Sequence, residues 1–113
     1  MPTVRDLVRD IQSEIRSAGD LLPDRASELL TTLSALIGNI NDEIREADAQ
    51  YAVVLLRFLD SDEAANRARI RAEITPEHRR KREARDTKEL AKEMIGTLKY
   101  FLRAKGEEMR LSR

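Results

Sequence analysis

A long, regular repeat of apolar residues occupies the middle of this chain. From residue 26 to residue 58 the apolar positions alternate in steps of four and three without interruption: Ala26, Leu30, Leu33, Ile37, Ile40, Ile44, Ala47, Tyr51, Val54 and Phe58. This spacing puts every member on one stripe of an α-helix, the stripe that faces a partner helix in a coiled coil. The repeat therefore predicts a long central helix with one buried side.

The composition favours the same fold class. Of the 113 residues, 37% are charged and 4% are aromatic, and the chain has only 4 Gly and 3 Pro. Strand-forming residues are scarce, and this mixture is typical of long helices. The length corresponds to one domain. We expect a single all-α domain over residues 1–113.

Capping and proline signals predict where the helices begin and end. Thr3 followed by Asp6 forms a short capping box, which places the first helix at about 3–18. The second helix is expected at about 24–74. Two places could break it, near residue 38 and near residue 60, but the heptad phase continues through both. A continuous helix is therefore the preferred interpretation, with the site near 60 as the weaker point.

Pro76 marks the start of a third helix, because proline is disfavoured inside a helix and well suited to its first turn. This helix is expected at about 76–110. Its apolar side is wider than a coiled-coil stripe and includes Leu98 and Phe101.

The expected arrangement is an elongated helical hairpin or coiled coil around the long central helix. The first and third helices would pack antiparallel to it and lie end to end. A reversal at residue 75 would pair positions whose numbers sum to about 150, so Tyr51 would lie near Tyr100. Since such a rod is only two helices thick, its apolar stripe needs a further partner. We expect a homodimer.

Charge is distributed unevenly along the chain. Residues 1–66 hold 6 basic and 13 acidic side chains, whereas residues 67–113 hold 15 and 8. The net charges of −7 and +7 indicate that the halves attract each other, either within one chain or between copies.

A basic segment stands out on either side of Pro76. Five cations fall between residues 79 and 85, where they oppose the helix dipole. With the nearby arginines of the preceding segment they form the candidate contact set: Arg67, Arg69, Arg71, Arg79, Arg80, Lys81, Arg82 and Arg85. At the tip of the expected hairpin these side chains would bind an acidic protein surface or nucleic-acid phosphates. The alternative is a solvated tip, neutralised by Glu73, Glu77 and Glu83 or by the acidic half of a second copy.

The residue patterns that usually carry catalysis or hold cofactors are missing from the sequence. Cysteine is absent, and the lone His78 follows a proline among cations. Asp42 and Glu46 have metal-site spacing, but the Glu-x-x-His pattern of helical di-metal sites is lacking. Neither a glycine-rich phosphate loop nor a catalytic triad pattern is found. We expect a protein that is not an enzyme, with no cofactor and no metal.

The sequence also bears on location. The longest apolar run, YAVVLL at 51–56, is too short to cross a bilayer, and the first ten residues do not resemble a secretory signal. A cytoplasmic protein without membrane contact is expected. No aromatic residue lies between positions 59 and 99, so the basic segment offers no stacking platform for single-stranded bases.

Two segments resemble small helical accessory proteins of tailed bacteriophages. They are ADAQYAVVLLRFLDSDEAANRARIRAEI and ARDTKELAKEMIGTLKYFLRAKGEEMRLSR, within residues 47–113. The resemblance lies in the charged helical hairpin and implies a factor in DNA recombination or replication, or an inhibitor of host machinery. It assigns no functional residue.

These observations favour a non-enzymatic helical interaction protein that binds a partner through the basic tip. One alternative is a DNA- or RNA-binding protein that contacts phosphates without reading bases. The other is a purely structural coiled-coil component of an assembly.

Overall fold

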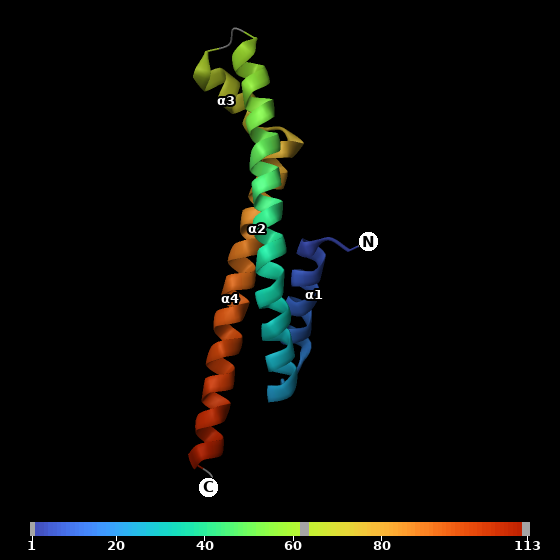
Figure 1. Ribbon diagram of the computed structural model, residues 1–113, viewed down its shortest axis with the longest axis vertical. Coiled ribbons are helices and arrows are strands. Elements are labelled where there is room, and N and C mark those ends of the chain that lie inside the picture. Colours follow the sequence, from blue (N-terminus) through green and yellow to red (C-terminus); the bar gives the residue numbers. More distant parts are fainter. Residues whose placement is uncertain (1, 62–63, 112–113) are drawn as a thin grey trace.

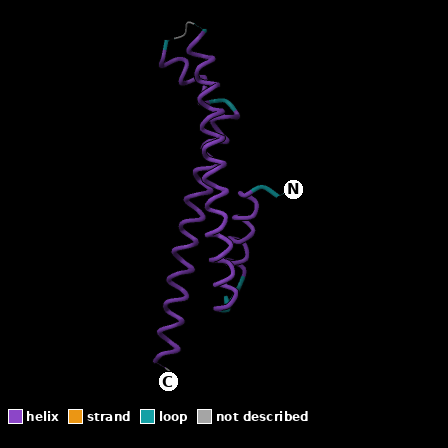
Figure 2. Tube along the Cα trace, in the orientation of Figure 1, coloured by secondary structure: helices purple, strands orange, loops and turns teal. Residues whose placement is uncertain are grey.

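The computed structural model describes residues 2–61 and 64–111, and over these residues the chain forms four helices (Figures 1 and 2). They are α1 (Val4–Ser17), α2 (Pro23–Asp60), α3 (Ala65–Glu73) and α4 (Pro76–Leu111). Together they form a rod with extents of 73 × 28 × 22 Å. The predicted all-α fold and elongated shape are confirmed.

Helix α1 begins at the predicted capping box. The Thr3 hydroxyl accepts a hydrogen bond from the Asp6 backbone N–H at 3.1 Å, and the Asp6 carboxylate accepts one from the Thr3 N–H at 3.0 Å. Two of the amide groups that a helix start leaves unpaired are thereby satisfied. The helix then buries Val8 and Ile11.

Helix α2 runs straight through Gly38 and buries much of the predicted stripe. Ala26, Leu33, Ile40 and Ala47, one per heptad, are fully or almost fully buried, whereas Leu30, Ile37, Ile44, Tyr51, Val54 and Phe58 are half-buried. Leu29 and Leu36, which lie beside the stripe, are buried as well. The buried surface of α2 is therefore wider than a coiled-coil stripe.

The expectation of a continuous helix over 24–74 is wrong, because α2 ends at Asp60 and α3 begins at Ala65. The Ser61 hydroxyl donates a hydrogen bond to the Phe58 carbonyl at 2.8 Å. This bond satisfies a carbonyl group in the last turn of α2. Helix α3 runs back alongside α2 (Figure 1), and its small residues Ala68 and Ala72 are buried. The chain therefore reverses between α2 and α3, not at residue 75.

The boundary predicted at Pro76 is present, but it separates two helices that both belong to the returning arm. Thr75 caps α4, since its hydroxyl accepts a hydrogen bond from the His78 N–H at 3.4 Å. Helix α3 packs beside the last part of α2, next to the reversal. The residues of α4 therefore lie further along α2 than a reversal at residue 75 would place them. Tyr51 packs on His78, with ring centroids 5.2 Å apart, while Tyr100 is 73% exposed. The predicted Tyr51–Tyr100 register is wrong.

Helix α1 packs against both α2 and α4, so this half of the rod is three helices thick (Figure 1). Both α1 and α4 are antiparallel to α2, as predicted, but they lie side by side and not end to end. Arg5 of α1 and Glu83 of α4 form an ion pair at 3.4 Å. The three helices enclose one core: Val8, Ile11, Ala26, Leu29, Leu33, Leu36, Ile40, Ala91, Met94 and Leu98, with Phe101 packed at its edge. The third helix explains the burial of Leu29 and Leu36.

Candidate anion-binding groove

The five cations at 79–85 do not lie at the tip of the rod. They lie on the first turns of α4, beside the acidic middle of α2. The Arg80 guanidinium donates to the Glu43 carboxylate at 3.0 and 2.8 Å and also to the Gln50 side chain. Arg85 donates to Asp48 at 2.8 Å. The attraction predicted between the two halves of the sequence thus operates within one chain.

These contacts make part of the basic segment structural. The Glu43 carboxylate raises the pKa of Arg80, and Glu46 adds to the effect at 3.6 Å. The Lys81 ammonium lies 4.4 Å from the centre of the Tyr51 ring, a cation–π contact. Arg80, Lys81 and Arg85 therefore hold α4 against α2.

The other predicted contact residues point in different directions. Arg79 and Arg82 are exposed on the side of α4 away from α2, where a depression of about 280 Å³ also brings in Glu73, Glu83 and Asp86. The exposed residues Arg67, Arg69 and Arg71 lie on α3. The eight predicted residues therefore do not form one surface.

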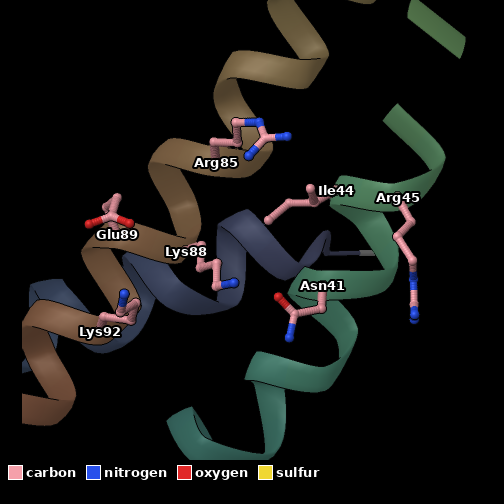
Figure 3. A pocket seen from close by; sticks show the side chains of 7 residues that line it. All are labelled: Asn41, Ile44, Arg45, Arg85, Lys88, Glu89 and Lys92. Atoms are coloured by element: carbon pink, nitrogen blue, oxygen red, sulfur yellow. The ribbon is translucent and has the colours of Figure 1, made fainter. Parts of the chain in front are cut away.

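A different set of cations does share one surface. An open groove of about 560 Å³ runs between α2 and α4 (Figure 3), lined by Asn41, Ile44, Arg45, Arg85, Lys88, Glu89 and Lys92. A second depression continues it through Asn41, Lys88 and Lys92 to Ile37, Ile95, Gly96 and Lys99. We call the two together the basic groove. Helix α1 lies behind α2 and α4 in this view, so the groove is on the side that α1 leaves uncovered.

The lysines of the basic groove have no acidic partner in the part of the chain that the structure describes. No carboxylate lies within ion-pair distance of Lys88, Lys92 or Lys99 there, whereas Arg85 is paired with Asp48 and Arg45 with Asp42. Glu89 also lines the groove but lies on the side of α4 that points away from α2 (Figure 3), and it forms no ion pair with these lysines. The basic groove therefore carries three lysines that have no ion-pair partner among the described residues.

The floor of the basic groove is apolar. Ile37 and Ile44 of α2 and Ile95 of α4 line it and are half-buried, and the Ile44 side chain points across towards α4 (Figure 3). A ligand in this groove would therefore meet apolar contacts at the bottom and ammonium groups at the rim.

Another depression, of about 730 Å³, lies at the N-terminal end of α1 and is larger than either part of the basic groove. Its lining includes Thr3, Ile40, Glu43, Arg80 and Thr87. Its central cation, Arg80, is already bound to Glu43, and Thr87 donates to the Glu83 carbonyl at 2.8 Å. Because these polar groups satisfy one another, this depression is a weaker candidate for a ligand site than the basic groove.

Other kinds of site find little support among residues 2–61 and 64–111. No three histidine, cysteine or acidic side chains there come close enough to hold a metal ion. Asp42, which the sequence placed near Glu46, pairs with Arg45. None of the described helices combines the length and apolar character that a bilayer span requires.

Sequence reasoning missed the groove lysines because they do not form a run. The signal was their spacing: from Arg85 to Lys88, Lys92 and Lys99 the steps are three, four and seven, which keeps all four on one helix face. No protein-family model, curated protein or solved structure matches the chain. The chemistry of the groove is therefore the basis for a functional assignment.

Proposed function

We propose that the protein is a non-enzymatic helical interaction protein that acts as a homodimer and binds an acidic segment of a partner protein in the basic groove. The observation that supports this best is the combination of three lysines, which have no acidic partner among the described residues, with an isoleucine floor. Lys88, Lys92 and Lys99 would attract carboxylates, while the isoleucines would contact apolar side chains.

An amphipathic helix is the partner element that fits this surface. Where α1 covers one side of the α2–α4 pair, a helix in the groove would cover the other side and complete a four-helix bundle. Its apolar residues, at positions i, i+3 or i+4 and i+7, would rest on Ile37, Ile44 and Ile95. Glutamate or aspartate beside them would face the lysines.

Nucleic acid is the second candidate, because a row of lysines along a helix also suits phosphates. The apolar floor favours protein, since a sugar–phosphate backbone gains little from contact with isoleucine. The two candidates differ in their response to salt. Each phosphate contact on duplex DNA lowers the logarithm of the binding constant by about 0.9 for every tenfold increase in salt concentration.

The test is affinity capture with three forms of the protein, each with and without nuclease. The groove variant carries Lys88→Glu and Lys92→Glu. The control variant carries Arg79→Glu and Arg82→Glu, the same charge change on the opposite side of the same helix. A partner protein that is retained by the wild type and the control variant but lost by the groove variant, with or without nuclease, supports the proposal. Equal retention by the groove variant contradicts it, and loss on nuclease treatment favours the nucleic-acid candidate.

A further inference from the structure

Asn41 interrupts the isoleucine floor of the basic groove. It lies four residues after Ile37 and three before Ile44 on α2, so the three side chains follow one stripe of the helix. Among the residues that line the groove it is the one uncharged polar side chain. It is half-buried, and its side-chain amide makes no hydrogen bond to any residue that the structure describes. The floor therefore contains an amide group that can still bind a ligand.

Two lysines of α4 share the position of Asn41 in the groove. Asn41, Lys88 and Lys92 each line both depressions of which the groove consists, so they lie where the two meet. Figure 3 shows the Lys88 side chain extending from α4 towards α2, which carries Asn41. Lys88 is half-buried, although no carboxylate among the described residues pairs with it. The middle of the groove thus presents one amide and two ammonium groups, and all three can donate hydrogen bonds.

A partner helix in the groove would remove water from Asn41 and Lys88 together. A leucine opposite them would leave both groups buried without a hydrogen-bond acceptor, which costs free energy. A carboxylate would accept from both, and hydrogen bonds to a charged group are stronger than those between neutral groups. Lys99 is exposed at the rim and would keep much of its water, so its charge contributes less to the choice of partner. The middle of the groove therefore discriminates between partners more than its rim does.

We infer that Asn41, Lys88 and Lys92 form a carboxylate-binding subsite in the middle of the basic groove, and that Asn41 selects a partner helix with an acidic residue there. This inference rests on the proposed function and specifies the sequence of the partner. The apolar stripe of the partner helix would carry a glutamate or aspartate between the residues that contact Ile37 and Ile44. This acidic residue would lie three or four positions from an apolar residue on either side. A helix with an uninterrupted apolar stripe would bind more weakly, although it suits the isoleucines.

Two synthetic peptides test this selectivity. Both are amphipathic helices of about 20 residues, long enough to span the groove at about 1.5 Å per residue, with leucine on the apolar stripe and glutamate along one edge. They differ at the central position of the stripe, which is glutamate in one peptide and leucine in the other. The wild type should bind the glutamate-centred peptide at least about tenfold more tightly, as measured by fluorescence anisotropy. Equal affinities, or tighter binding of the leucine-centred peptide, overturn the inference.

Asn41→Leu isolates the contribution of the amide. Its helicity should not fall, since leucine has the higher helix propensity of the two residues. The preference for the glutamate-centred peptide should fall about tenfold, because the leucine-centred peptide no longer leaves an amide unsatisfied. The matched control is Asn39→Leu, the same change at an exposed position of α2 that does not line the groove. A preference that Asn41→Leu leaves unchanged, or that Asn39→Leu lowers as much, contradicts the role of Asn41.

The groove variant distinguishes failure of this inference from failure of the proposed function. With Lys88→Glu and Lys92→Glu, both peptides should lose affinity, since both carry glutamate along the edge that would face α4. If both are lost but the wild type does not distinguish the two peptides, the basic groove stands and the subsite is wrong. If the groove variant retains both peptides, or the wild type binds neither, the groove assignment fails together with this inference.

Discussion

The Arg80 guanidinium lies 2.8 Å from the Glu43 carboxylate, although 37 residues separate the two in sequence. This pair joins the start of α4 to the middle of α2 and lies just beyond the N-terminal end of α1. Its side chains are 35% and 40% exposed, so water screens it only in part. It therefore helps to set the register of the two long helices.

A double-mutant cycle should detect this coupling. Arg80→Ala and Glu43→Ala should each lower the free energy of unfolding, and the pair should show a coupling of about 1 kcal/mol, near the upper end for partly exposed ion pairs. Urea denaturation of the four proteins measures it. Arg79→Ala is the control, because Arg79 is exposed on the opposite side of α4. Its effect should be close to zero, and a coupling between Arg80 and Glu43 that is also near zero would show that the pair does not set the register.

The three-helix core predicts unequal effects at adjacent residues of α2. Leu36 is 8% exposed within the core, whereas its neighbour Ile37 is half-buried in the groove floor. Leu36→Asp should cost more than about 3 kcal/mol, because it places an unpaired charge among apolar side chains. Ile37→Asp should cost clearly less. Thermal or urea unfolding tests the difference, and the reverse order would favour the two-helix stripe over the three-helix core.

The Glu14–Arg25 contact between α1 and α2 predicts a pH effect. Two guanidinium nitrogens of Arg25 donate to the Glu14 carboxylate at 2.6 Å, and these hydrogen bonds lower the pKa of Glu14 below its ordinary value of 4.5. Because the folded-state pKa is lowered, the pair stabilises the fold above pH 4.5, and that stability is lost as the pH falls through the lowered pKa.

NMR titration of the Glu14 side chain provides the measurement. In Arg25→Gln the pKa of Glu14 should rise towards 4.5, since the cause of its lowering is gone. The pKa of Asp6 is lowered by the backbone and hydroxyl of Thr3 and should not change, which makes it the internal control. An unchanged Glu14 titration would show that the two helices do not meet through this pair.

Local signals in the sequence predicted the helices better than their arrangement. The capping box at Thr3 and the helix start at Pro76 depend on neighbouring residues only, and both were correct. The heptad repeat correctly identified Leu33 and Ile40 as buried. It could not show that Leu36 is buried too, because that depends on where α1 packs.

The break near residue 60 was named as a possibility, but the continuous helix was preferred for a physical reason. Ala65, Ala68 and Ala72 continue the heptad phase beyond Asp60, so periodicity alone favours one helix. The two arrangements differ in their tertiary contacts, because only a reversal after Asp60 brings Arg80 next to Glu43 and Arg85 next to Asp48. The cations at 79–85 then lie beside α2 and not at the end of the rod, and Lys88, Lys92 and Lys99 come to line the groove.

Mapping the bound partner on the protein tests the central claim most directly. The partner recovered by affinity capture would be titrated onto the isotope-labelled protein, and backbone amide shifts would be followed by NMR. The account predicts that the shifts concentrate at residues 85–99 of α4 and 37–45 of α2, the two walls of the basic groove. Shifts confined to Arg79 and Arg82, or to the arginines of α3, would contradict it.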